Sequence, residues 1–215
     1  MTQFDYLLEN RDRVWELTVE HLQMTLLAVG VALLIALPLG IVAARYRRIG
    51  GPILSALGVV YTIPSLAALA FLIPLVGLGR KPAIIVLAAY AQIFLVRNII
   101  AGLRAVDPAT LEAARGMGMT GPQVFLKVQL PLALPVIIAG VRIALVTTIS
   151  LATITAWINA GGLGELLFNG ITRNNQSMIW AGTIAVTVLA LLADQVLRLV
   201  ERMTATSRAR RAATR

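Results

Sequence analysis

Long runs of residues without a charged side chain constrain this chain most. One run extends from residue 21 to 44 and another from residue 49 to 79. A helix crosses the hydrocarbon core of a bilayer with about 20 apolar residues, so either run is long enough to span a membrane. Only 13% of the 215 residues are charged, against about 25% in a typical soluble domain. The sequence therefore predicts one all-α integral membrane domain.

Prolines and polar segments divide the apolar sequence into about five predicted transmembrane helices. We expect these spans at residues 21–44, 54–73, 82–102, 135–157 and 178–200. The second span is expected to break or kink at Pro64, because proline removes a helical hydrogen bond. A polar, glycine-rich loop is expected between the last two spans, over residues 159–177.

The two ends of the chain differ from its apolar middle. Residues 1–20 place apolar side chains at helical spacing with five acidic residues largely opposite, which predicts an amphipathic helix at the membrane interface. A solvated helix that packs on its own protein fits the same pattern. The expected organisation is an interfacial helix at 1–20, a transmembrane domain at 21–200 and a basic tail at 201–215.

The basic residues predict the orientation, because Lys and Arg gather in the cytoplasmic loops of membrane proteins. With five spans, eleven basic residues fall on one side of the membrane and five on the other. We therefore expect the N-terminus outside and the C-terminus in the cytoplasm. The net charge of +9 follows from this topology, so we expect no nucleic-acid partner.

Residue types required for several chemistries are absent from the sequence. There is no cysteine and only one histidine, His21, which excludes disulfides, thiolate chemistry and sites with several histidine ligands. The sequence also has no phosphate-binding loop of the G-x-x-x-x-G-K-[ST] type. We therefore expect no catalytic, cofactor-binding or metal-binding residue in this chain.

A polar segment at residues 107–131 interrupts the apolar sequence. Asp107 is a favourable N-cap and Pro108 a favourable first residue for a short helix, and Gly116 and Gly118 predict its end. Such a helix, with small side chains on one face, suits docking into a groove on another protein.

The same segment contains two further patterns. Thr120 and Gln123 form a capping-box pattern for a second short helix. Gly116, Gly118 and Gly121 match the dinucleotide-binding pattern G-x-G-x-x-G, which requires a preceding strand. A helix precedes these glycines, so we reject dinucleotide binding.

One pattern in this segment resembles a known family. E-A-A at residues 112–114 is followed by Gly118 after three residues and by V-Q-L-P at residues 128–131 after nine more. This resembles the EAA loop of ABC importer permeases of type I, with Val128 in place of isoleucine. The resemblance implies that a loop at about 104–131 couples the permease to a cytoplasmic ATPase. The coupling residues would be Glu112, Ala113, Ala114, Arg115, Gly116, Gly118, Leu130 and Pro131.

Other stretches resemble permeases of osmoprotectant importers, which carry glycine betaine, choline, carnitine or proline betaine. They include Y-T-I-P-S-L-A at 61–67, V-R-N at 96–98 and A-G-G-L-G at 160–164. Asn159 departs from the glycine expected in that family, near the outer gate.

The resemblance implies a permease subunit in the cytoplasmic membrane of a bacterium or archaeon, and no enzymatic activity of its own. ATP and Mg²⁺ would bind to partner ATPase subunits, which would switch the permease between inward- and outward-facing states. The other expected partners are a second permease subunit, identical or paralogous, an extracytoplasmic substrate-binding protein and membrane lipids.

Charged residues inside the predicted spans are a second group of candidates. Arg97, Arg142 and Asp194 lie where an uncompensated charge is costly, so interior partners are expected. Snorkelling, a structural ion pair, and a gate contact that changes partners during transport all fit the sequence. The candidate pathway residues are Tyr61, Tyr90, Thr147, Thr155 and Asn159. The tyrosines could bind a quaternary ammonium group or anchor the helices at the interface.

Three other functions fit parts of the pattern. The first is an ABC importer for another small solute, such as methionine or another amino acid. The second is an ATP-independent channel or carrier, which would need no ATPase partner. The third is a membrane anchor for a cytoplasmic enzyme.

Overall fold

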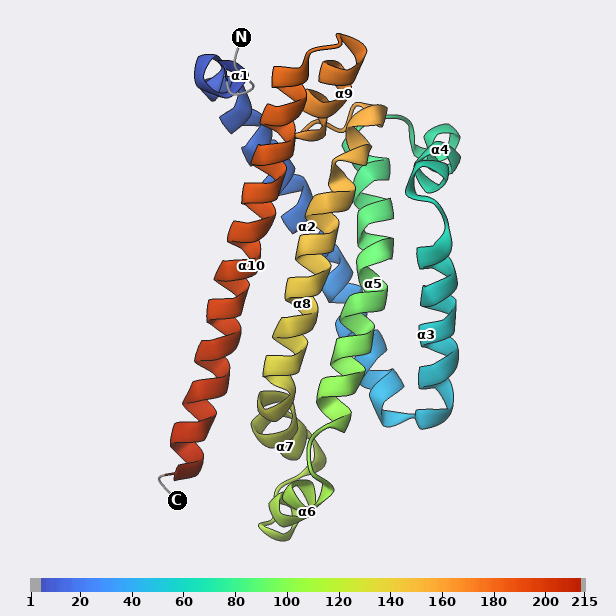
Figure 1. The fold of residues 1–215 in the computed structure, drawn as a ribbon. Helices are drawn as coiled ribbons and strands as arrows, with labels where there is room; N and C mark the ends of the chain where they lie inside the picture. The colour runs from blue at the N-terminus through green and yellow to red at the C-terminus, as the bar shows by residue number, and fades with distance from the viewer. Residues whose placement is uncertain (1–4, 214–215) are drawn as a thin grey trace.

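The structure is a computed structural model that describes residues 5–213, and every regular element in this part of the chain is helical (Figure 1). The helices are α1 (Asp5–Glu9), α2 (Arg11–Arg45), α3 (Arg47–Thr62), α4 (Ser65–Val76), α5 (Arg80–Arg104), α6 (Pro108–Gly116), α7 (Gly121–Val124), the π-helix η1 (Phe125–Gln129), α8 (Leu130–Ala152), the 3₁₀-helix η2 (Ile154–Ile158), α9 (Gly164–Thr172) and α10 (Gln176–Ala213). The all-α prediction is confirmed.

Four helical stretches of the described chain are long and apolar enough to cross a membrane, and a bent pair supplies a fifth. The four are α2, α5, the continuous stretch Gly121–Ala152, and α10 as far as Thr204. The bent pair is α3 and α4, which meet at 88°. The break falls at Ile63 and Pro64 as expected, because the residue before a proline favours an extended backbone.

The expected boundary at residue 20 is not a helix boundary. Helix α2 continues from Arg11 through Arg45 without a break, so most of the predicted interfacial segment is the beginning of the first span. No proline or glycine stands between residues 11 and 29 to end the helix, and Glu20 is held by contacts to two other segments. The remainder of that segment is α1, and residues 1–4 lie outside the described part.

Two other boundaries also differ from expectation. The predicted loop at 159–177 contains α9, whose buried Leu166 packs in the same apolar cluster as Leu163. The last helix, α10, does not end near residue 200 but continues through Ala213, so the backbone of the basic tail is helical up to that residue. Residues 214 and 215 lie outside the described part.

Helix α5 forms the centre of the bundle. It packs against α2 and α8 through close backbone approaches at glycines, where Gly40 lies against Ile99 and Gly102 against Ala133. Two thirds of its most apolar stretch is buried within the chain (67%), against 6% for α10. Much of α10 therefore faces lipid or another subunit.

The short helices lie at opposite ends of the bundle. Figure 1 shows α1 and α9 at one end, called here the α9 end, and α6 and α7 at the other, called the α6 end. The connection between α2 and α3 also lies toward the α6 end.

Candidate functional site

Helix α6 protrudes beyond the transmembrane helices at the α6 end (Figure 1). It begins as expected, because the backbone N–H of Ala109 donates to Asp107 Oδ1 over 3.0 Å and Pro108 needs no donor at the first position. It ends at Gly116, and Gly118 follows with φ +84°, a conformation that favours glycine.

The residues of α6 divide into a buried anchor and an exposed surface. Ala114 is buried, with 2% of its surface exposed, and attaches the helix to the bundle. Glu112, Ala113, Arg115 and Gly116 are exposed. The exposed surface therefore combines small residues with one acidic and one basic side chain.

Packing within the described chain does not require glycine at the three glycine positions of this segment. A Cβ atom at Gly116, Gly118 or Gly121 would meet no atom within 4 Å. Only Gly118 is required by its backbone conformation. The surface around these glycines therefore has room for a close approach by another molecule.

A rigid connection joins this segment to α8. The backbone N–H of Thr120 donates to Gln123 Oε1 at 2.9 Å, the part of the predicted capping box that fixes the start of α7. The π-helix η1 leads into α8, and the Leu130 N–H donates to Phe125 O across its turn. The wider π turn accommodates Pro131, which lacks an N–H. Leu130 is half-buried and Pro131 exposed.

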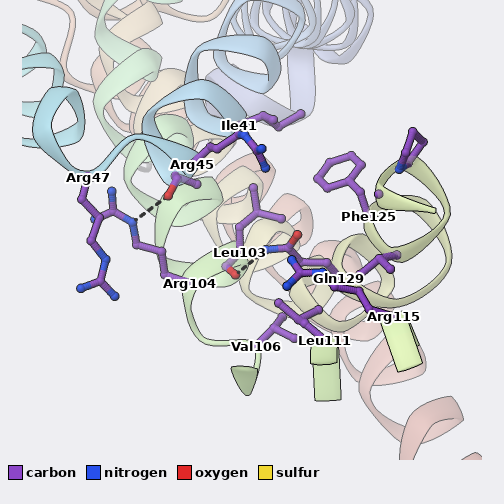
Figure 2. Close-up of a pocket in the computed structure, with 14 residues that line it drawn as sticks. Ile41, Arg45, Arg47, Leu103, Arg104, Val106, Leu111, Arg115, Phe125 and Gln129 are labelled. Carbon is purple, nitrogen blue, oxygen red and sulfur yellow. Dashed lines mark hydrogen bonds between the residues drawn. The ribbon is translucent and has the colours of Figure 1, made fainter. Parts of the chain in front are cut away.

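Between α6 and the transmembrane helices lies a pocket of about 720 Å³ that the sequence did not predict (Figure 2). Arg104 closes one side, donating from Nη2 to Ala43 O at 2.7 Å and from Nε to Ala44 O at 3.2 Å. Gln129 Nε2 donates to Leu103 O at 3.1 Å. The lining residues are Ile41, Ala44, Arg45, Arg47, Leu103, Arg104, Val106, Leu111, Arg115, Gly121, Pro122, Val124, Phe125 and Gln129.

Two of the three predicted intramembrane charges form an ion pair between α8 and α10. Arg142 Nη1 lies 3.3 Å from Asp194 Oδ1. The sequence reasoning missed two further members, since Arg198 Nη2 lies 2.7 Å from Asp194 Oδ2 and Glu201 Oε2 lies 3.5 Å from Arg142 Nε. Spacings of four and seven residues after Asp194 place both on one helix face and could have indicated them.

Arg97 differs from this cluster. It is exposed on α5 and forms no ion pair with another described residue. It lies seven residues before the end of α5, which is about 10 Å at the helical rise. At this depth an unpaired arginine either snorkels to the interface or has a water-filled cavity or another subunit beside it.

The candidate tyrosines come together where α3 ends. The ring centroid of Tyr61 lies 5.7 Å from that of Tyr90 and 5.2 Å from that of Phe94, both edge-to-face. The Tyr90 hydroxyl donates to Ile63 O and so holds the break between α3 and α4. Tyr61 is 38% exposed, whereas Tyr90 is buried. Residues 90, 94 and 97 share one face of α5, so Arg97 lies on the side of this cluster.

The other three pathway candidates do not join this cluster. Thr155 is buried, and its hydroxyl donates to Ala152 O at 2.8 Å. Thr147 is half-buried on α8. Asn159 is exposed, with φ 58°, where η2 ends and the chain turns toward α9.

Ion pairs close the α9 end. Arg13 contacts Glu16 at 2.7 Å and Glu165 at 2.8 Å, which joins α2 to α9. Glu20 contacts Arg80 Nη2 at 3.0 Å and accepts a hydrogen bond from the backbone N–H of Gly162 at 3.1 Å. These side chains hold the glycine turn that the sequence placed at this end.

His21 is part of the same closure. Its side chain is fully buried, and Nε2 lies 2.9 Å from Ile149 O. Since a carbonyl only accepts, Nε2 carries the proton. Gly162, with φ +83°, packs directly on His21, and a Cβ there would lie 2.9 Å from Nδ1. No group of three or more His, Cys, Asp or Glu in the described residues could hold a metal ion.

Solved structures with this fold include ABC transporters. The chain superimposes on structures of the MetNI methionine ABC transporter in inward-facing conformations, with a TM-score of 0.79, 24% identity, and 95% of this chain and 99% of that chain covered. It also resembles an amino acid ABC transporter with histidines, with a TM-score of 0.75, 21% identity, and coverage of 94% and 99%. At this identity the likeness establishes the fold.

Curated relatives are more similar in sequence. The choline transport system permease protein OpuBB of Bacillus subtilis is 41% identical, covering 86% of this chain and 85% of the relative. The osmoprotectant import permease protein OsmW of Salmonella typhimurium is 39% identical, covering 92% and 94%. The carnitine transport permease protein OpuCB of Listeria monocytogenes is 40% identical, covering 90% and 88%.

The family comparison agrees with both results. The model of the binding-protein-dependent transport system inner membrane component matches residues 36–205, which contain the spans from the end of α2 to α10 and the whole of α6. The chain belongs to this family of inner membrane permease components.

Proposed function

We propose that this chain is the permease subunit of an ATP-driven importer for quaternary-ammonium osmoprotectants such as glycine betaine, choline and carnitine. The observation that carries the proposal is α6, a capped helix that protrudes from the bundle with Glu112 and Ala113 exposed and glycines bordering open space. Relatives named for choline, carnitine and osmoprotectant transport, at about 40% identity over most of both chains, support the substrate class.

In this proposal α6 is the element that the partner ATPases move. ATP and Mg²⁺ bind to those partners, and the permease transmits the movement. The π-helix η1 and the bond from Gln129 to Leu103 O fix α6 and α7 to α8 and α5, so a push on α6 tilts those spans as one body. An extracytoplasmic binding protein delivers the substrate.

We place the α6 end in the cytoplasm. Arg45 ends α2 at this end, and Arg47 and Arg48 begin α3. Arg104 ends α5, and Arg115 lies in α6. The positive-inside rule supports this orientation, which puts the N-terminus outside.

A second permease subunit completes the pathway. Arg97 is exposed inside a span, and the exposed Tyr61 lies on the same side of α5. We assign this side to the pathway between two permeases, where an aromatic face attracts a quaternary ammonium group and Arg97 can act as a gate. Thr147, Thr155 and Asn159 remain pathway candidates for other conformations, whereas Arg142 and Asp194 join α8 to α10.

Uptake into vesicles tests the function. The permease is reconstituted with its ATPases and binding protein, and uptake of labelled glycine betaine, choline, carnitine and methionine is compared with and without internal ATP. We expect ATP-dependent uptake of the first three. Uptake of methionine alone, or uptake that an ion gradient drives without ATP, would contradict the proposal.

Variants of the coupling segment sharpen this test. Glu112→Lys and Gly118→Leu are expected to lower uptake at least about ten-fold while the protein still inserts, because they alter the surface that the ATPase contacts. The matched controls are Asp12→Lys, an exposed acid at the α9 end, and Gly77→Leu, because Gly77 has a φ of +81° close to that of Gly118 and a Cβ there would also meet no atom within 4 Å. Normal uptake by Glu112→Lys would argue against coupling through α6.

The absence of cysteine allows a separate test of orientation. A membrane-impermeant maleimide should label Asp12→Cys in intact cells and Glu112→Cys only after the membrane is opened. The reverse pattern would place α6 outside and exclude contact with a cytoplasmic ATPase.

A further inference from the structure

We propose that the pocket at the α6 end binds the phosphate headgroup of an anionic membrane phospholipid. This inference rests on the proposed function, because the orientation proposed there puts the pocket at the inner leaflet. Four arginines from three segments line it: Arg45 and Arg47 flank the corner between α2 and α3, Arg104 ends α5, and Arg115 lies in α6 (Figure 2). None of its lining residues is acidic.

Three of these arginines are available to a ligand. Arg104 is used within the chain, since it donates to the carbonyls at the end of α2. Arg45, Arg47 and Arg115 are exposed, and none has an ion pair or a side-chain hydrogen bond to another described residue. Guanidinium groups match the geometry of phosphate oxygens and bind them through paired hydrogen bonds.

The depth of the pocket suits a lipid headgroup. Arg45 ends α2 directly after a charge-free stretch of membrane-spanning length, and Arg104 is the last residue of α5. Both therefore stand where a span leaves the hydrocarbon core. Ile41, Leu103 and Phe125 give the same pocket an apolar side on which the glycerol and upper acyl chain can lie.

The surroundings favour lipid over an acidic segment of the ATPase. Neighbours of the lining residues expose apolar surface, with Val42 44% exposed, Tyr46 57% and Leu126 59%. Such surface is stable against acyl chains and headgroups and is unfavourable in water. An ATPase approaching from the cytoplasm meets α6 first, because α6 lies farthest out at this end of the bundle (Figure 1).

Native mass spectrometry can test this site. The full chain, alone and assembled with its ATPases, is mixed with equal amounts of phosphatidylglycerol and phosphatidylcholine that carry the same acyl chains. We expect preferential retention of phosphatidylglycerol in both forms. Arg45→Gln and Arg47→Gln should each lower that retention about five-fold, the factor equivalent to ~1 kcal/mol for one basic residue at an anionic surface. Arg48→Gln is the matched control, since Arg48 is exposed beside Arg47 but does not line the pocket.

Several outcomes would overturn the proposal. Equal retention of both lipids, or an equal loss in Arg48→Gln, would show general surface attraction without a site. Complete displacement of phosphatidylglycerol by inorganic phosphate would show a site for free anions. Loss of phosphatidylglycerol when the ATPases assemble would assign the pocket to the ATPase. The measurement does not involve uptake, so a chain that retains the lipid but fails to import osmoprotectants would contradict only the proposed function.

Discussion

The two ends of the bundle differ in whether their charged side chains form ion pairs. At the α9 end, Arg13 pairs with Glu16 and Glu165, and Arg80 pairs with Glu20. At the α6 end, the exposed charged residues form no ion pair with another described residue; they are Arg45, Arg47, Arg48, Arg104, Asp107, Glu112, Arg115 and Lys127. Exposed charges without an ion pair also lie at the α9 end, as at Asp12 and Lys81, but ion pairs link separate helices there. No ion pair involves the described residues from α6 to η1 or the corner between α2 and α3.

The glycines at the two ends also differ in how closely other atoms surround them. At the α9 end, a Cβ at Gly161 would lie 2.6 Å from Glu20 Oε2, and one at Gly162 would lie 2.9 Å from His21 Nδ1. At the α6 end, a Cβ at Gly116 or Gly118 would meet nothing within 4 Å. Packing inside the chain therefore explains the first pair, and the second pair leaves room for a surface outside it.

The largest effect is expected from adding a methyl group at each end. Gly164→Ala should lower the free energy of unfolding by about 3 kcal/mol or more, because the new Cβ overlaps the carbonyl oxygen of Thr153, a backbone atom. Gly116→Ala in α6 should stabilise slightly, by about 0.5–1 kcal/mol, since it removes a glycine from a helix without a contact. Unfolding of the purified protein in detergent measures both free energies. An equal loss of stability in the two variants would show that the glycines at the two ends are packed alike.

The second largest loss of stability is expected from a change in the charged cluster between α8 and α10. Asp194→Asn removes the partner of Arg142 at 3.3 Å and of Arg198 at 2.7 Å, in a setting where the Asp194 side chain is only 23% exposed. We expect a loss of about 2 kcal/mol, less than for a fully buried pair. A double-mutant cycle with Arg142→Gln should show a coupling of about 1 kcal/mol. Strictly additive losses would show that the two side chains do not pair, which would leave Glu201 as the partner of Arg142.

Local signals in the sequence predicted the α6 end well. Asp107 and Pro108 start α6 and Gly118 follows its end, since caps and positive φ depend on adjacent residues. Pro64 predicted the break between α3 and α4 for the same reason. These features need no knowledge of the rest of the fold.

Features made by distant residues could not be predicted. Glu20 meets Gly162, 142 positions away, and this contact holds the segment that was expected to be a separate helix. One side of the pocket is formed by Arg104, which reaches the end of α2, about 60 positions earlier. Charge counting showed many arginines on this side of the membrane, but only packing brings four of them to one cavity.

A smaller difference in stability is expected between substitutions of Glu20 at the α9 end and of Glu112 at the α6 end. Glu20→Gln removes the ion pair with Arg80 and weakens the bond from Gly162 N–H, so we expect a loss of about 1 kcal/mol. Glu112→Gln, at an exposed residue of α6 without a partner in the described chain, should change stability by less than about 0.5 kcal/mol. Thermal unfolding in the same detergent compares them. A larger loss in Glu112→Gln would mean that α6 depends on its charge for folding and that its surface is not free.

The smallest effect is expected at the exposed pair between Arg13 and Glu165, and its salt dependence identifies it. Their side chains are 46% and 30% exposed, so Glu165→Gln should cost about 0.5 kcal/mol at low ionic strength. Near 1 M salt the Debye length is about 3 Å and the difference from the parent protein should disappear. Arg13 keeps Glu16 in this variant, which limits the loss further. A difference that persists at high salt would show that Glu165 joins α2 to α9 by packing, and the closure of the α9 end would then not depend on charge.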